Sequence, residues 1–155
     1  MSEERAVAAL EASGIPFEVT RHGQVATLAE AAAARGVEPA KLIKTIVVRR
    51  ADQDYLFVLV PGDRQISWPK LRGLLGVSRL SMPSKEVAFE VTGYERGTIT
   101  PFGSFHRWPV VADSRLSEPG PVSIGGGAHG VGATVDAVDL TAALDATVAD
   151  VTDPA

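Results

Sequence analysis

The chain of 155 residues is 45% hydrophobic and 22% charged, with a net charge of −4, which suits one folded domain with a sizeable core and argues against disorder. No apolar stretch approaches the about 20 residues of a membrane helix, and the N-terminus lacks the basic and apolar regions of a secretory signal, so we expect a cytoplasmic protein with no membrane partner. Cysteine is absent and the three histidines, His22, His106 and His129, match no metal-ligand spacing, so we predict no disulfide, no thiolate nucleophile, no metal site and no cofactor.

The first half of the chain carries signals for helices and strands in alternation. Ser2 and Gly14 bracket a first helix, and the alternating Ile15, Phe17 and Val19 predict a strand after it. The next expected elements are a helix from the Thr27–Glu30 capping box to Gly36, a helical turn at Pro39, a β-branched strand at 44–48 and a partner strand at 55–60.

The second half predicts more strand than helix. Its expected elements are a helix between Ser67 and Gly76, a helix at 83–89, a glycine-rich loop at 92–104, strands at 108–112 and 122–124, a helix capped by Asp139 that runs to Leu144, and a strand at 147–151. No repeat or low-complexity linker divides the chain. We therefore predict a single domain over residues 1–155, of mixed α/β or α+β class.

The net charge hides an asymmetry along the chain. Residues 41–85 contain nine basic and three acidic residues, a net charge of +6, which leaves −10 on the remainder. A polyanionic partner could dock on the basic portion while the acidic remainder limits indiscriminate binding. The alternative is that solvated strand ends and helix faces are basic here without any partner.

Lys44 is the first candidate for chemistry. It stands with Thr45 at the head of an apolar strand, where a lower dielectric would strengthen the hold of its ammonium group on an anion or a carbonyl. The alternative is an edge lysine whose charged end reaches water.

Two glycine-rich segments are the other candidates. Residues 92–103 contain Gly97 and Thr98, and residues 125–130 read Gly-Gly-Gly-Ala-His-Gly. Glycines let backbone N–H groups approach a ligand closely and stabilise the oxyanion of an ester under attack. Either segment could instead be a tight connection between strands. His129 stands out among the histidines because it lies within a glycine loop.

Familiar catalytic and nucleotide-binding motifs are absent. The chain has no dinucleotide fingerprint in a strand–turn–helix setting, no Walker A pattern and no nucleophile elbow. Ser104 and His106 are close in sequence, but no third group completes a triad. A binding protein for a small phosphorylated metabolite, with the glycine loops as an anion nest, remains an alternative.

Three segments together resemble a known family. Lys44–Val48, residues 92–103 and the Gly-Gly-x-x-Gly run at 126–130 occur in the order and spacing of the YbaK/EbsC family of aminoacyl-tRNA deacylases. This family is similar to the editing insertion domain of bacterial prolyl-tRNA synthetases. The resemblance covers nearly the whole chain and implies a mixed α/β fold around a curved, barrel-like sheet flanked by helices.

The resemblance also implies an activity. Members hydrolyse the ester that joins a wrong, small amino acid to the 3′ end of tRNA, so the implied partners are the acceptor end of a mischarged tRNA and an aminoacyl-tRNA synthetase. Lys44 resembles the essential lysine, and Gly97 the glycine whose backbone amide faces the substrate carbonyl. The residues implied in substrate binding are Thr45, Thr98, Gly125, Gly126, Gly127 and His129.

Gly125 and Gly132 depart from the family pattern. Some members carry serine at the first position and an acid at the second, so two polar groups near the pocket are missing here. These changes keep open a non-catalytic tRNA- or synthetase-binding module of the same fold.

Overall fold

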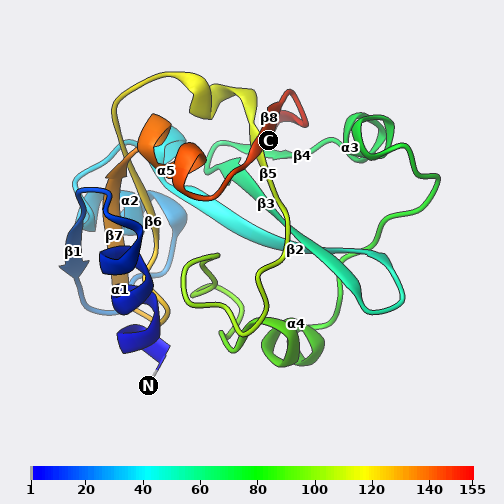
Figure 1. Ribbon diagram of the computed structural model, residues 1–155. Coiled ribbons are helices and arrows are strands. Elements are labelled where there is room, and N and C mark those ends of the chain that lie inside the picture. Colours follow the sequence, from blue (N-terminus) through cyan, green and yellow to red (C-terminus); the bar gives the residue numbers. More distant parts are fainter. Residues whose placement is uncertain (1) are drawn as a thin grey trace.

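A computed structural model describes residues 2–155 and shows helices packed around three small β-sheets (Figure 1). The helices are α1 (Ser2–Ser13), α2 (Leu28–Ala34), α3 (Trp68–Leu75), α4 (Lys85–Thr92) and α5 (Ala137–Ala143), with 3-10 turns η1 (Pro39–Lys41) and η2 (Ser114–Ser117). The strands are β1 (Glu18–Arg21), β2 (Ile43–Ala51), β3 (Asp54–Pro61), β4 (Arg64–Ile66), β5 (Val110–Asp113), β6 (Pro121–Gly125), β7 (Val131–Asp136), β8 (Thr147–Ala149) and β9 (Thr152–Pro154). Within residues 2–155, no helix has both the length and the hydropathy to cross a membrane.

Short polar side chains begin two helices, α2 and α3, at the places that the sequence predicts. The Oγ1 atom of Thr27 accepts a hydrogen bond of 3.1 Å from the backbone N–H of Glu30, so the predicted cap of α2 forms. Ser67 caps α3 in the same way, and Gly76 ends that helix in the left-handed region at φ +66°.

The cap of α5 differs from the prediction. The carboxylate of Asp136 accepts hydrogen bonds from the amides of Val138 (3.0 Å) and Asp139 (3.1 Å), so the helix begins at Ala137. The assignment of the cap to Asp139 was wrong because β7, which the sequence did not reveal, ends at Asp136 and delivers this earlier carboxylate to the first free amides.

The strands form a three-stranded, a four-stranded and a two-stranded sheet. The first has the order β1-β7-β6 and is antiparallel, the second has the order β2-β3-β5-β8 with parallel and antiparallel pairs, and the third pairs β4 with β9. A parallel bridge between Leu42 and Ser123 connects the first two sheets. The predicted mixed α/β class is confirmed, although the sheets do not close into a barrel.

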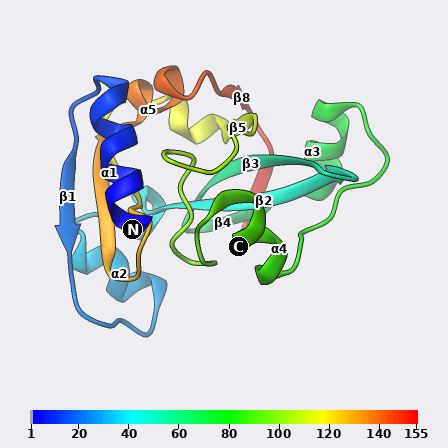
Figure 2. The same ribbon diagram turned by 60° about the horizontal axis from the view of Figure 1, so that its bottom comes forward.

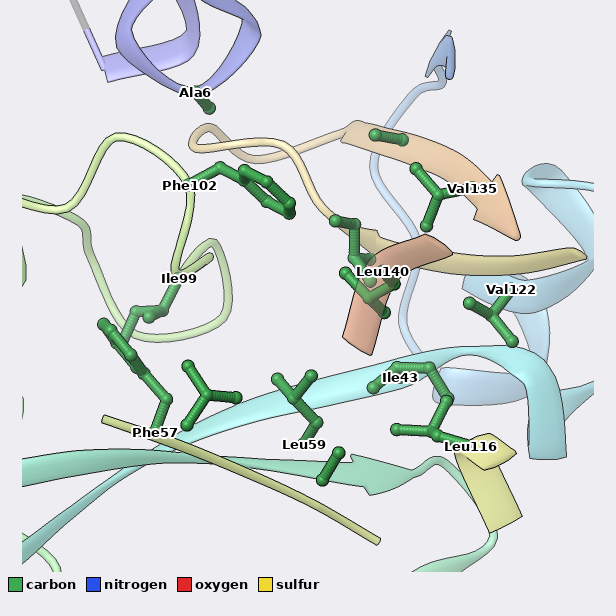
Figure 3. Close-up of a cluster of buried hydrophobic side chains, with 14 of the residues drawn as sticks. Ala6, Ile43, Phe57, Leu59, Ile99, Phe102, Leu116, Val122, Val135 and Leu140 are labelled. Carbon is green, nitrogen blue, oxygen red and sulfur yellow. The ribbon is translucent and has the colours of Figure 1, made fainter. Parts of the chain in front are cut away.

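The β2–β3 hairpin separates two hydrophobic cores. Because successive side chains of a strand point to opposite faces, Ile43, Val47 and Phe57 enter one core, and Val48 and Val58 enter the other. The larger core also takes side chains from the sheet of β6 and β7 and from the loop before β5 (Figure 3). The helix α1 lies along this sheet in both ribbon views (Figure 2).

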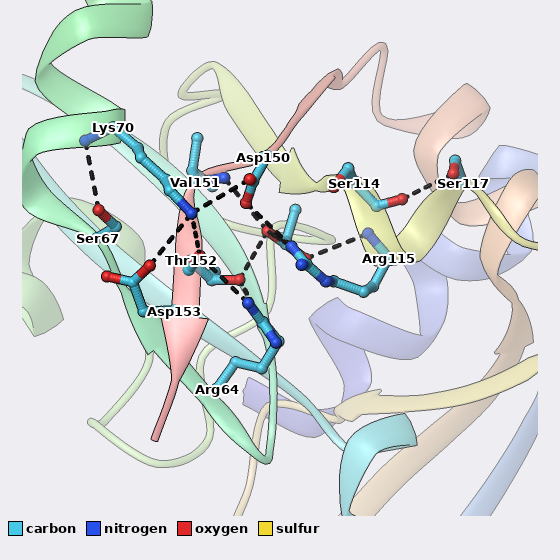
Figure 4. Close-up of polar contacts among 11 residues, drawn as sticks. Arg64, Ser67, Lys70, Ser114, Arg115, Ser117, Asp150, Val151, Thr152 and Asp153 are labelled. Carbon is cyan, nitrogen blue, oxygen red and sulfur yellow. Dashed lines mark hydrogen bonds and ion pairs between the residues drawn. The ribbon is translucent and has the colours of Figure 1, made fainter.

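A buried carboxylate ties the C-terminal strand to the second sheet. Asp113, at the end of β5, is fully buried and accepts hydrogen bonds from the amide of Val151 (3.3 Å) and the hydroxyl of Thr152 (2.8 Å). Arg115 lies 3.4 Å from the same carboxylate and 3.0 Å from Asp150 (Figure 4). The end of the chain is therefore held by polar contacts that bridge residues far apart in sequence.

Candidate functional site

A bridge between the first two sheets brings Lys44 near the paired glycines Gly125 and Gly132, and these three positions are called the row of Lys44 below. The bridge from Leu42 to Ser123 is parallel, and Lys44 and Gly125 lie two residues further along each chain segment. Gly125 pairs in turn with Gly132 across the β6–β7 ladder. Paired residues share a face of the sheet, so Gly125 and Gly132 face the same way.

Lys44 is a half-buried cation without a carboxylate in direct contact. Its Nζ donates a hydrogen bond of 2.7 Å to the carbonyl of Arg64, the first residue of β4. Within residues 2–155 it forms no ion pair. Burial lowers the pKa of Lys44, and the charge of Asp63 opposes that shift. The arrangement provides a charge that is incompletely neutralised and available to an anion or a polarised carbonyl.

The two glycine-rich segments lie in contact. The sequence predicted their order along the chain but not this contact. The amide of Gly127 donates a hydrogen bond of 3.1 Å to the carbonyl of Thr98. Together with neighbouring residues they line a hollow of about 260 Å³, which is formed by Ser2, Phe89, Gly93, Glu95, Thr98, Gly127, Ala128 and His129. Gly97 adjoins this hollow, and its backbone has a left-handed conformation with φ +92°. Among residues 2–155 its amide has no hydrogen-bond acceptor, so it is available as a donor to a ligand.

His129 lies at the rim of the hollow and is largely exposed. Its Nε2 atom is 3.1 Å from a carboxylate oxygen of Glu95, which positions the ring beside Gly97. A Cβ atom added at Gly97 would lie 3.9 Å from the His129 ring. The ring is therefore close enough to contact a ligand bound at the Gly97 amide.

Gly125 and Gly126 lack side chains because other backbone segments pass close to them. A Cβ atom at Gly125 would lie 2.8 Å from the carbonyl oxygen of Ile99, and one at Gly126 would lie 2.6 Å from the side chain of Val131. The Gly126 amide donates to the Val131 carbonyl at 3.0 Å. Close packing alone thus accounts for both glycines, and their role in substrate binding stays a prediction.

Thr45 lies on the face of β2 opposite to Lys44, and neither of these two residues lines the hollow. Its Oγ1 atom is buried and has no hydrogen-bond partner within residues 2–155. Its predicted part in substrate binding therefore gains no geometric support from the neighbouring site residues.

Sequence reasoning missed Arg35 and His22, whose side chains meet above Gly132. The Nε atom of Arg35 donates to Nε2 of His22 at 3.2 Å. Nothing in an alanine-rich helix that ends in arginine shows which way the arginine points, so only the folded structure reveals this pair. A larger hollow, of about 830 Å³, lies between α1, the loop at 101–110 and the end of α5, and contains none of the predicted site residues.

Comparison with known proteins identifies the family. The model of the aminoacyl-tRNA editing domain matches residues 22–143, well over half of the chain. The chain belongs to this family. The matched range of the editing domain includes the row from Lys44 to Gly132 and both glycine-rich segments.

The relatives of this editing domain connect it with prolyl-tRNA synthetases. The proline–tRNA ligase of Heliobacterium modesticaldum is 35% identical over 102 residues, which are 66% of this chain and 17% of the ligase. That of Thermosipho melanesiensis is 31% identical over 109 residues, which are 70% of this chain and 19% of the ligase. The chain therefore spans about a fifth of the length of these relatives.

A solved structure extends the likeness to nearly the whole chain. The protein, described as a candidate trans-editing enzyme for prolyl-tRNA synthetase, is 27% identical with a TM-score of 0.87, over 98% of this chain and 97% of its own. The predicted resemblance to the prolyl-tRNA synthetase editing insertion is confirmed.

Proposed function

We propose that the protein is a trans-editing hydrolase that deacylates mischarged aminoacyl-tRNA, by hydrolysing the ester between a small amino acid and the tRNA 3′ end. The observation that carries this proposal is the editing-domain match over residues 22–143. It is supported by a structural relative of almost equal length, which is described as a candidate trans-editing enzyme for prolyl-tRNA synthetase. The partners that follow are the acceptor end of a mischarged tRNA and an aminoacyl-tRNA synthetase, the prolyl enzyme first among them.

The proposed chemistry is attack by water on the ester carbonyl, without a covalent enzyme intermediate. The water oxygen bonds to the carbonyl carbon, the ester C–O bond breaks, and the ribose oxygen leaves with a proton. The terminal ribose hydroxyl next to the ester helps to position the water. The chain has no cysteine, which agrees with the absence of a thiolate nucleophile from this scheme.

Lys44 and Gly97 supply the electrostatic part of the mechanism. The ammonium group of Lys44, which among residues 2–155 is hydrogen-bonded only to a backbone carbonyl and whose pKa is lowered by burial, anchors the 3′-terminal phosphate or the carbonyl oxygen. The free amide of Gly97 stabilises the oxyanion, an effect typically worth about 10²–10³ in rate per donor. Discrimination between amino acids then rests on pocket size, where one methyl group is worth only about 1–3 kcal/mol.

A panel of mischarged tRNAs tests the proposal. Each tRNA is incubated with the wild type, with Lys44→Ala and with Lys70→Ala, and the loss of labelled amino acid is measured over time. Lys70 is a matched control because its ammonium group is already paired with two carboxylates, those of Asp150 and Asp153. We expect one or two species to be deacylated by the wild type and Lys70→Ala, and at least 10²-fold more slowly by Lys44→Ala.

The same panel distinguishes the second candidate, a non-catalytic tRNA- or synthetase-binding module. That candidate is favoured by the glycines at 125 and 132, which leave no side-chain polar group in the row beside Lys44. It predicts saturable binding of charged tRNA with no loss of label. Equal deacylation rates for the wild type and Lys44→Ala would refute the proposed role of Lys44.

A further inference from the structure

Arg35 follows the last turn of α2 and points back over the sheet of β6 and β7. Its Nε atom donates to Nε2 of His22 at 3.2 Å, and its Nη1 atom is 3.5 Å from the carbonyl oxygen of Ile124. The Nδ1 atom of His22 lies 2.9 Å from the carbonyl of Gly23, which suits an N–H at Nδ1 and a lone pair at Nε2. The guanidinium is therefore held in place by acceptors that carry no charge.

Among the residues that the structure describes, no carboxylate pairs with Arg35. Within residues 2–155 it forms no ion pair, although the side chain is half-buried. Burial lowers the pKa of Arg35, which reflects the cost of placing this charge away from water. Arg35 is thus a half-buried cation with uncharged partners and with N–H groups that remain available. An anion would balance its charge and accept hydrogen bonds from these N–H groups.

The absence of a side chain at Gly132 makes room for this guanidinium. A Cβ atom built at Gly132 would lie 2.7 Å from Cδ and Nε of Arg35 and 2.9 Å from its Cζ. Even alanine would therefore push the arginine aside. Gly132 pairs with Gly125 across the β6–β7 ladder, so Arg35 lies over one of the two glycines at which this chain departs from the family pattern.

We propose that Arg35 is a specificity-determining residue that binds an oxyanion of the substrate, a carboxylate or a phosphate, above Gly132. The inference rests on the proposed editing function and names what this site would recognise. The planar fork of arginine suits two oxygens of one carboxylate or phosphate group. The anion could be a phosphate of the tRNA 3′ end or a carboxylate carried by the wrongly attached amino acid.

Three kinds of ester substrate distinguish the two possible sources of the anion. They are a tRNA charged with a neutral amino acid, a tRNA charged with aspartate or glutamate, and an aminoacyl-adenosine that has no phosphate. The variants are Arg35→Gln, which removes the charge, Arg35→Lys, which keeps the charge without the fork, and Gly132→Ala, which displaces the guanidinium. Arg107→Gln is the control, since Arg107 is exposed and lines the separate 830 Å³ hollow.

We expect Arg35→Gln and Gly132→Ala to lower kcat/KM at least tenfold, mainly by raising KM. Arg35→Lys should retain part of the wild-type kcat/KM, and Arg107→Gln should retain all of it. If the anion is a phosphate, kcat/KM falls equally for every tRNA ester and is unchanged for the aminoacyl-adenosine. If the anion is a carboxylate, kcat/KM falls only for the tRNAs charged with aspartate or glutamate. An unchanged kcat/KM for all tRNA esters in Arg35→Gln, or an equal loss that includes a neutral aminoacyl-adenosine, would overturn the proposal.

A second measurement does not depend on hydrolysis. The Nε–H NMR signal of Arg35 is followed in the wild type during titration with inorganic phosphate and, separately, with acetate. A saturable shift that is absent in Gly132→Ala supports the anion site, and no shift with either probe refutes it. If the wild type deacylates no tRNA but the shift is seen, the proposed function fails while the anion site stands.

Discussion

Among single residues, Gly127 and Gly14 have similar backbone conformations but very different surroundings. Both lie in the left-handed region, at φ +87° and +77°. A Cβ atom at Gly127 would meet the carbonyl oxygen of Ser2 at 2.7 Å and the side chains of Tyr94 and Ala6 near 3 Å, whereas one at Gly14 meets nothing within 4 Å. Gly127 thus lets α1 pack directly against the glycine-rich segment that lines the candidate site.

Replacing Gly127 with alanine should therefore cost more stability than the same change at Gly14. Gly14→Ala adds only backbone strain, about 1 kcal/mol, and Gly127→Ala adds an overlap with a backbone carbonyl, for a total of about 2–4 kcal/mol. The free energies of unfolding are measured by urea denaturation of both variants and the wild type. Equal losses would mean that α1 can shift away from the loop without cost.

Residue-level prediction from sequence succeeded where the signal is local. The strand that carries Lys44 and the glycines that turn the chain could be recognised because residue type alone determines their local conformation. The pairing of Arg35 with His22 over Gly132 could not be recognised, because it depends on where α2 lies relative to β7. The proposed anion site therefore emerges only from the three-dimensional arrangement.

At the level of elements, helix ends depend on local signals that the sequence shows, whereas strand pairings depend on contacts between distant residues. The caps at Thr27 and Ser67 were predicted because donor and acceptor lie three residues apart. The strands β4 and β9 were not predicted, since each has three residues and pairs with a segment far away in sequence. Glycine and alanine within β7 also obscured that strand.

The attachment of β9 should depend on Asp113 more than on the exposed carboxylates around it. Asp113→Ala would leave the Val151 amide and the Thr152 hydroxyl without their buried acceptor, and we expect a loss of about 3 kcal/mol in the free energy of unfolding. Asp150→Ala removes a half-exposed partner of Lys70 and Arg115 and should cost far less.

Urea denaturation measures both losses, and hydrogen exchange locates them. Faster exchange of the β4 and β9 amides in Asp113→Ala, with little change in Asp150→Ala, is the expected pattern. A larger loss in Asp150→Ala than in Asp113→Ala would mean that the surface ion pairs around Asp150 dominate.

Across the whole molecule, the basic segment is less available to a polyanion than its net charge implies. Arg49 pairs with Asp52 and Arg50 with Asp54 inside the segment, and Lys70 pairs with carboxylates from the C-terminal strand region. The other six bases form no ion pair within residues 2–155; they are Lys41, Lys44, Arg64, Arg72, Arg79 and Lys85. If tRNA docks on this side, the unpaired bases should provide most of the attraction.

The double variant Arg79→Gln/Lys85→Gln tests this with a matched control, Arg49→Gln/Arg50→Gln, which removes the same charge from residues already paired with aspartates. Each phosphate contact releases counterions and contributes about 0.7–0.9 to the slope of log K against log salt, so we expect the first variant to reduce that slope by about 1.5. Filter binding of a non-acylated tRNA between about 50 and 200 mM salt measures it. Equal slopes in the two variants would show that net charge, and not the unpaired bases, governs docking, because both variants change the net charge by the same amount.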